Sequence, residues 1–126
     1  MNKIVIDTNG YLRLLLNDVS QQANQIEELL IKAKKGQILI FLPQIIVFEM
    51  VFILAKYYRF SKEEVLDKIE SLVSIEYVEV ESREIFLRAI SLYRDNVVSF
   101  VDCFIFTSAE KNNAKLFTFD KKLQKI

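Results

Sequence analysis

Histidine is absent from the 126-residue chain, and Cys103 is the only cysteine. A zinc site with the usual cysteine and histidine ligands is therefore excluded, and no disulfide can form within the chain. A single thiol fits a reducing compartment, so we expect a cytoplasmic protein. The charges are balanced, with 17 Lys plus Arg against 17 Asp plus Glu. The net charge thus points to no polyanionic partner, and any such site must come from local clustering of basic residues.

Glycine and proline are also scarce, with two and one residues, whereas 52% of the residues are hydrophobic. This composition and length predict one ordered domain over residues 1–126 with a sizeable core. The longest apolar stretch, residues 38–55, is interrupted by Pro43, Gln44 and Glu49. Because a carboxylate is costly at the centre of a bilayer, we expect no membrane-spanning segment there.

Short apolar runs alternate with helical patterns along the chain. The runs "KIVI" (3–6), "ILIF" (38–41) and "KLFTF" (115–119) predict strands covered on both faces, and "IEYVEV" (75–80) predicts a weaker strand. Helical spacing predicts helices over residues 10–17, 20–35, 43–58, 61–74, 82–95 and 99–112. The alternation predicts an α/β protein, a three-layer α/β/α sandwich around a mostly parallel central sheet of about four or five strands.

Individual residues mark the expected ends of these helices. Ser20 suits an N-cap, and Gly36 stands where the same helix would end. Ser61 followed by Glu64 is the pattern of a capping box, which predicts a helix start.

Four of the acidic residues stand in or directly after apolar runs, namely Asp7, Glu49, Asp102 and Asp120. Asp7 ends "IVID" and Asp120 ends "LFTFD", so both follow predicted parallel strands. Open α/β sheets gather their ligand sites at the carboxyl ends of such strands. Glu49 lies within "IIVFEMVFI", where its helical neighbours are apolar, so we expect it to have no solvated face and to need a partner.

Each acid also has an ordinary structural explanation. Asp7 and Asp120 precede helical patterns and suit N-caps, and Asp102 with Ser99 fits a capping box. Glu49 would be satisfied by a salt bridge to a distant basic residue or by a hydrogen bond from the backbone. Each explanation is reasonable for its own residue. To replace a functional site, however, all four would have to hold at once, for acids that share an apolar context and, we expect, one end of the sheet.

Four converging carboxylates repel one another unless a cation lies between them. Because the ligands would all be oxygen atoms, the expected cofactor is Mg²⁺ or Mn²⁺. Such an ion, held by carboxylates with open positions, polarises a phosphodiester and generates a hydroxide nucleophile. The acids therefore predict hydrolysis at phosphorus, and by themselves leave nucleic acid and other phosphoryl substrates open.

The segments "IVIDTNGYLRLLLND", "PQIIVFEMVFIL" and "SFVDCFIFTSAEKNNAKLFTFD" resemble, in order and spacing, those of a PIN-domain ribonuclease. More narrowly they resemble the VapC-type toxins of bacterial toxin–antitoxin pairs, over essentially the whole chain. The resemblance implies a metal-dependent endoribonuclease that hydrolyses RNA, with tRNA or rRNA the usual targets. It also implies a cognate antitoxin and a homodimer as partners.

Residue by residue, the resemblance assigns a catalytic and metal-binding quartet to Asp7, Glu49, Asp102 and Asp120. It assigns pocket-lining or supporting roles to Thr8, Asn9, Ser99 and Thr118. Asn113 stands where relatives often have glycine, a mild change because asparagine tolerates left-handed turns. Relatives continue beyond the position of Ile126 into another strand, so we expect this single domain to lack that C-terminal edge strand.

Local basic residues are compatible with an RNA substrate. Lys121 and Lys122 directly follow Asp120, and Arg13 lies one helical turn past Asn9. All three are candidates for phosphate contacts, although for Arg13 a structural ion pair is an equal alternative. A competing function is a catalytically silent PIN-like module that binds RNA or protein. Stabilisation by Mg²⁺ would separate the two, because a ligand that binds only the folded state raises the melting temperature.

Overall fold

Three parallel strands form the sheet of the computed structural model, which describes residues 1–126. They are β1 (Asn2–Val5), β2 (Ile38–Leu42) and β3 (Val78–Val80), in the spatial order β1-β2-β3. In the register of the sheet, Ile40 of β2 lies between Ile4 of β1 and Val78 of β3. Ile40 and Leu42 are fully buried, as expected for the middle strand of a parallel sheet.

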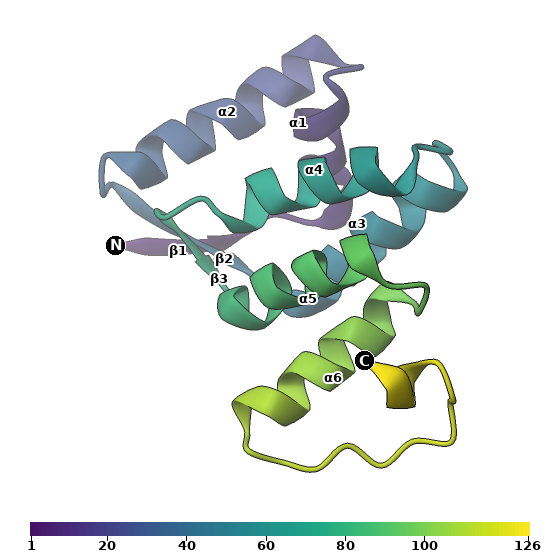
Figure 1. Cartoon of the computed structure of the whole chain (residues 1–126). Coiled ribbons are helices and arrows are strands. Elements are labelled where there is room, and N and C mark those ends of the chain that lie inside the picture. The colour runs from purple at the N-terminus through teal and green to yellow at the C-terminus, as the bar shows by residue number, and fades with distance from the viewer. The chain divides into compact units, whose positions relative to one another are not determined.

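Two pairs of helices make the connections that parallel strands require. α1 (Thr8–Leu16) and α2 (Ser20–Lys34) lie between β1 and β2, and α3 (Gln44–Lys56) and α4 (Lys62–Val73) lie between β2 and β3. Within each pair the two helices pack against each other (Figure 1). These elements form a compact N-terminal unit, Met1–Glu81. Its largest fully buried side chains are those of Tyr11, Leu12, Ile40, Leu42, Val47, Met50, Leu54, Leu66, Ile69 and Leu72.

Tyr11 fixes α1 in this core. Its hydroxyl is buried without a hydrogen-bond partner, and burial raises the pKa of Tyr11 to about 12. The side chain therefore stays neutral and acts as an apolar anchor.

The helix ends of the N-terminal unit follow most of the sequence signals. Gly36 has a φ of +75°, and the Gln37 N–H donates to the Lys32 carbonyl at 2.9 Å, which confirms the predicted end of α2. The predicted N-cap at Ser20 is wrong by one position. The Ala23 N–H donates to the carbonyl of Val19, so the helix already starts from Val19 and Ser20 is its first residue.

The capping box at the start of α4 is confirmed. Ser61 Oγ accepts from the Glu64 N–H at 3.2 Å, and Glu64 Oε1 accepts from the Ser61 N–H at 3.0 Å. The hydrogen bonds from Ser61 lower the pKa of Glu64, because they favour the charged carboxylate.

The second compact unit, the C-terminal unit Ser82–Ile126, consists of a helix pair and a tail. α5 (Arg83–Asp95) packs against α6 (Phe100–Lys111), with the Phe86 ring 6.2 Å from that of Phe100 and 4.9 Å from that of Phe104. The tail ends in a 3-10 turn, η1 (Leu123–Lys125). Asn113, which directly follows the C-cap of α6, has a φ of +53°, so the left-handed turn expected there is confirmed.

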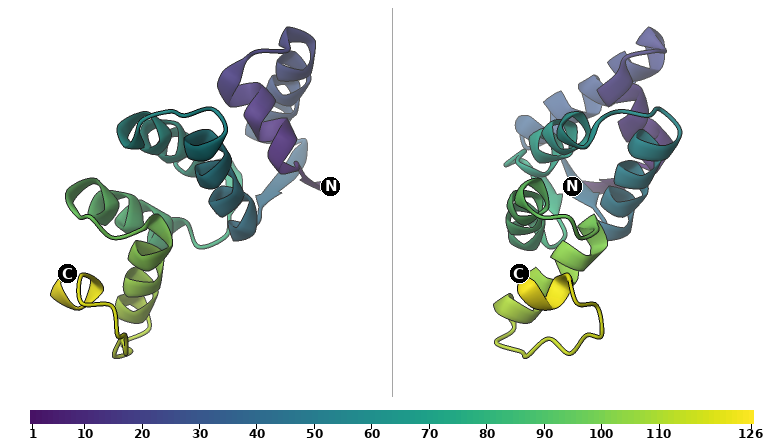
Figure 2. Two further views of the ribbon diagram at one scale, coloured as in Figure 1. Left: turned by 90° about the vertical axis from the view of Figure 1, so that its right-hand side faces the viewer. Right: turned by 45° about the vertical axis from the view of Figure 1, so that its right-hand side comes forward.

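The predicted strand at 115–119 is not formed, and the sheet therefore has three strands rather than four or five. Figures 1 and 2 show this part of the chain as an irregular loop that leads from α6 to the C-terminal turn. A strand exists only when a neighbour exchanges backbone hydrogen bonds with it, and this segment pairs with none. Its alternating aromatic residues, Phe117 and Phe119, are 81% and 86% exposed and contact each other instead.

The expected α/β class and parallel sheet are confirmed by these elements. None of the helices combines the length and the hydropathy that a membrane span requires.

Candidate functional site

Asp7 lies just beyond β1 and forms the N-cap of α1. Its Oδ1 accepts from the Gly10 N–H at 2.9 Å, so the capping role considered from the sequence is real and uses one carboxylate oxygen. Gly10 makes this close turn feasible, because a Cβ atom there would lie only 2.5 Å from Ile6 Cγ2. Sequence reasoning missed this role of Gly10, although its place three residues after a capping aspartate was a usable signal.

Glu49 lies in the middle of α3 and contacts the start of α1. Thr8 Oγ1 donates to Glu49 Oε1 at 3.2 Å, which joins two predicted site residues that are 41 positions apart. The expectation that Glu49 has no solvated face is wrong. Glu49 is exposed, and the neighbouring Ile45 and Phe52 are exposed with it, because α3 packs its other side, with Met50 and Leu54, into the core.

In the C-terminal unit, Asp102 occupies the first turn of α6. Ser99 Oγ accepts from the Asp102 N–H at 3.1 Å, so Ser99 is the N-cap that the sequence indicated. The Asp102 side chain is partly buried, next to the fully buried Cys103. A carboxylate in a first turn also interacts favourably with the N-terminal end of the helix dipole.

Asp120 opens the C-terminal turn. Its Oδ1 accepts from the N–H groups of Lys122 and Leu123, at 2.8 and 3.0 Å. Thr118 Oγ1 in turn accepts from the Asp120 N–H at 3.0 Å. The capping role considered for Asp120 is therefore visible as hydrogen bonds, and Leu123 is buried in the same turn.

The structure thus places the predicted quartet as one pair of acids in each unit. Asp7 and Glu49 are linked through Thr8 in the N-terminal unit, whereas Asp102 and Asp120 belong to the C-terminal unit. Neither unit by itself gathers three acidic or cysteine side chains that could hold a metal ion. None of the four acids takes part in an ion pair, since the salt bridges involve other carboxylates.

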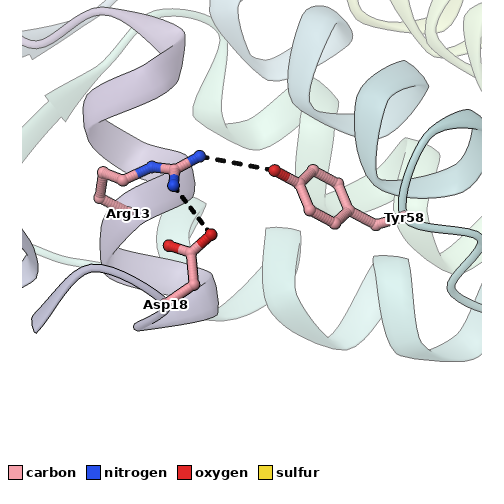
Figure 3. A network of polar contacts seen from close by, with 3 residues as sticks. All are labelled: Arg13, Asp18 and Tyr58. Carbon is pink, nitrogen blue, oxygen red and sulfur yellow. Dashed lines mark hydrogen bonds and ion pairs between the residues drawn. The ribbon is translucent and has the colours of Figure 1, made fainter.

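Arg13 forms a structural ion pair, which was one of the two roles considered for it from the sequence. Its Nη1 lies 2.8 Å from Asp18 Oδ2, and its Nη2 donates to the Tyr58 hydroxyl at 3.4 Å, as Figure 3 shows. The guanidinium therefore ties α1 to the loop that follows α3. The other predicted phosphate contacts, Lys121 and Lys122, are exposed, as is Asn9 in the first turn of α1.

A shallow pocket of about 450 Å³ lies in the C-terminal unit, between the start of α5 and the end of α6. Its walls are formed by Ser82, Arg83, Glu84, Ile85, Lys111 and Asn112. It contains none of the four acids, so it is not the predicted site.

Comparison with known proteins decides the family. Residues 4–126 match the sequence model of the family described as PIN domain. The chain belongs to the PIN-domain family. It is also similar to the VapC ribonuclease of Aquifex aeolicus (strain VF5), with 26% identity over 124 residues, which cover 97% of this chain and 90% of that protein. The resemblance drawn from the sequence motifs is thus confirmed, and the family match includes the acids of both units.

Proposed function

We propose that this PIN-domain protein is a Mg²⁺- or Mn²⁺-dependent endoribonuclease, and that Asp7, Glu49, Asp102 and Asp120 are its metal-binding and catalytic acids. The observation that carries the proposal is the family match over residues 4–126, which contains all four acids. The name of the relative, a ribonuclease, supports RNA as substrate. We also propose a three-layer α/β/α fold. The proposed partners are a cognate antitoxin and a second copy of the chain.

The donor set fits a hard divalent cation. The four groups are carboxylates, which Mg²⁺ and Mn²⁺ prefer over nitrogen or sulfur ligands. No lysine or arginine neutralises them. Asp7 and Asp120 use only Oδ1 in their backbone hydrogen bonds, which leaves the second oxygen of each available.

When bound, the metal would supply positive charge and an activated water for phosphodiester hydrolysis. The residues of the chain prepare the ligands for it. The Gly10 N–H fixes Asp7, Thr8 orients Glu49, and the backbone of the C-terminal turn fixes Asp120. Such hydrogen bonds hold a ligand in place before the cation arrives, which increases metal affinity. Exposed Lys121 and Lys122 are proposed to contact RNA phosphates.

A cleavage assay tests this function. Purified protein is incubated with tRNA, rRNA and short single-stranded RNAs in Mg²⁺ or Mn²⁺, and parallel reactions contain EDTA. We expect internal cleavage that EDTA abolishes and that is lost in Asp7→Asn. Glu28→Gln, an exposed acid on α2, is the matched control and should cleave normally. Absence of cleavage of every RNA, together with absence of divalent-ion binding by calorimetry, would refute the proposal.

A further inference from the structure

The segment that joins α3 to α4 exposes aromatic and basic side chains together. The sequence "KYYRF", Lys56 to Phe60, begins with the last residue of the α3 helix, which carries Glu49. Tyr57 is 71% exposed and Tyr58 is 41% exposed. Between Glu49 and Glu63 the chain has three basic residues, Lys56, Arg59 and Lys62, and no acidic one. This combination of rings and positive charge distinguishes the KYYRF segment from the other loops of the unit.

The backbone of the KYYRF segment is held in a defined shape. The N–H groups of Tyr57 and Tyr58 both donate to the Ile53 carbonyl, at 2.9 and 3.3 Å, and the Phe60 N–H donates to the Leu54 carbonyl at 3.1 Å. Arg59 has a φ of +55°, in the left-handed region that usually favours glycine. A long cationic side chain is thus kept at a position where its backbone conformation is unfavourable. Such a residue at a strained position is a reason to look for a function.

Neighbouring side chains hold the rings of the KYYRF segment in place. The Tyr58 and Phe60 rings are stacked, with centroids 6.4 Å apart and an interplanar angle of 20°. Arg13 donates to the Tyr58 hydroxyl while it pairs with Asp18, so this ring is braced from α1 (Figure 3). Lys68 Nζ lies 5.0 Å from the centre of the Phe60 ring. The Tyr58 and Phe60 rings are therefore held in place, and the Tyr57 ring beside them meets the Phe52 ring edge to face, with centroids 6.3 Å apart. Rings that are ordered before a ligand arrives lower the entropic cost of binding.

One exposed face of α3 connects the KYYRF segment to Glu49. Glu49, Phe52 and Lys56 are spaced i, i+3 and i+7, so they lie on the same side of the helix, and all three are exposed. Lys56 Nζ is 5.7 Å from the centre of the Phe52 ring. Tyr57 follows Glu49 by eight residues, a distance of about 12 Å along the helix axis. A flexible strand bound at Glu49 could follow this face to Tyr57.

We infer that the KYYRF segment is a binding surface for single-stranded RNA, on which an unpaired base stacks against Tyr57 while Lys56 and Arg59 contact the flanking phosphates. Exposed aromatic rings next to cations are the combination with which proteins bind single strands, since every base offers a face for stacking. Duplex RNA buries its base faces and would not use Tyr57 in this way. The inference rests on the proposed function, because it takes the bound strand to be the substrate of the site that includes Glu49.

Fluorescence anisotropy with a labelled single-stranded RNA of twelve nucleotides tests the inference. The measurement is made in EDTA, so that binding is read without cleavage. Tyr57→Leu should weaken binding about tenfold, the usual order for loss of one stacked base, whereas Tyr57→Phe should bind normally. Tyr77→Leu is the matched control, since Tyr77 is another partly exposed tyrosine of the same unit. The double variant Lys56→Ala and Arg59→Ala should reduce the salt dependence of binding.

The outcomes separate this surface from the nuclease proposal. Equal affinity of Tyr57→Leu and the unchanged protein would overturn the inference, as would equal loss in Tyr77→Leu or equal affinity for a duplex. A shift of Tyr57→Leu from dimer to monomer in size-exclusion chromatography with unchanged RNA binding would also overturn it, because the rings would then belong to a protein interface. If the unchanged protein binds RNA through Tyr57 but cleaves none, the surface stands and the nuclease proposal fails. If it cleaves RNA and Tyr57→Leu binds RNA normally, the nuclease proposal stands and the proposed binding surface fails.

Discussion

The two compact units hold their candidate acids in different ways. In the C-terminal unit, Asp102 and Asp120 are placed by hydrogen bonds that span two or three residues. In the N-terminal unit, Glu49 accepts from Thr8 over a separation of 41 residues. A local bond needs only its own turn, whereas a bond between α1 and α3 needs the packed core that positions both helices. Asp7 is also held locally, by the Gly10 N–H, so changes in the core should disturb Glu49 more than the other three acids.

Replacing one acid in each unit gives the largest expected effect. Asp7→Asn and Asp102→Asn should each lower the RNA cleavage rate by about a hundredfold or more, since loss of even an outer partner of a metal site costs about ten to a hundredfold. Both variants preserve side-chain shape, and circular dichroism checks that they fold. If Asp102→Asn cleaved nearly as fast as the unchanged protein, Asp102 would not belong to the metal-binding set and would only be a first-turn helix residue.

Gly10→Ala tests the close packing between Gly10, at the start of α1, and Ile6. The added Cβ would lie 2.5 Å from Ile6 Cγ2, and overpacking of this kind costs about 1–3 kcal/mol of unfolding free energy. Urea denaturation measures the loss. In the background of Ile6→Leu, which removes the Cγ2 branch, the same change should cost clearly less.

Gly36→Ala is the comparison for this variant. Nothing lies within 4 Å of a Cβ at Gly36, but its φ of +75° is unfavourable for alanine. We expect a cost of about 1–2 kcal/mol from backbone strain alone, and Ile6→Leu should leave that cost unchanged. If Ile6→Leu reduced the loss of stability in both variants, the contact with Ile6 would not be the cause of the loss in Gly10→Ala.

The sequence was most informative where the physical signal is local. Ser61 with Glu64 and Gly36 each predicted a helix boundary that the structure shows, and Asn113 adopts the left-handed conformation that asparagine tolerates. Caps and left-handed turns depend on only a few neighbouring residues. The strands β1 and β2 were also predictable from their apolar runs, and β3 from the weaker alternating pattern of residues 75–80. The same reasoning found the capping groups at Asp7 and Ser99.

Reasoning from the sequence failed where the outcome depends on a partner far along the chain. The run 115–119 has the composition of a strand, but it lacks a paired neighbour, and Phe117 and Phe119 remain exposed. Glu49 was expected to be enclosed because every helical neighbour is apolar, yet α3 buries only one of its sides and leaves Phe52 exposed. Periodicity shows that a face is apolar, but whether anything covers that face is a tertiary property. The contact between Thr8 and Glu49 was hidden for the same reason.

Thr8→Val should have a smaller effect, on activity rather than stability. Valine keeps the shape of threonine but cannot donate to Glu49 Oε1, so the carboxylate loses its fixed orientation. We expect cleavage to fall by about tenfold, the usual order for a partner of a metal ligand, and Thr8→Ser to restore it. Thr118→Val, which removes the local bond to the Asp120 N–H, is the matching change in the other unit. A normal rate in Thr8→Val would mean that this long-range bond does not prepare the site.

The smallest expected effect concerns the capping box of Ser61 and Glu64, whose hydrogen bonds are local to the start of α4 in the N-terminal unit. Hydrogen bonds from Ser61 lower the pKa of Glu64 below its ordinary value of 4.5. A carboxyl group with a lowered pKa in the folded state stabilises the protein fully above its unfolded pKa, and this contribution disappears as the pH falls through the lowered value. Glu64→Gln should therefore be less stable than the unchanged protein at pH 7, and the difference should shrink as denaturation is repeated at pH values below 4.5. Because the box is local, cleavage at neutral pH should be unaffected. A difference that stays constant from pH 7 to pH 3 would show that Glu64 acts through the shape of its side chain and not through its charge.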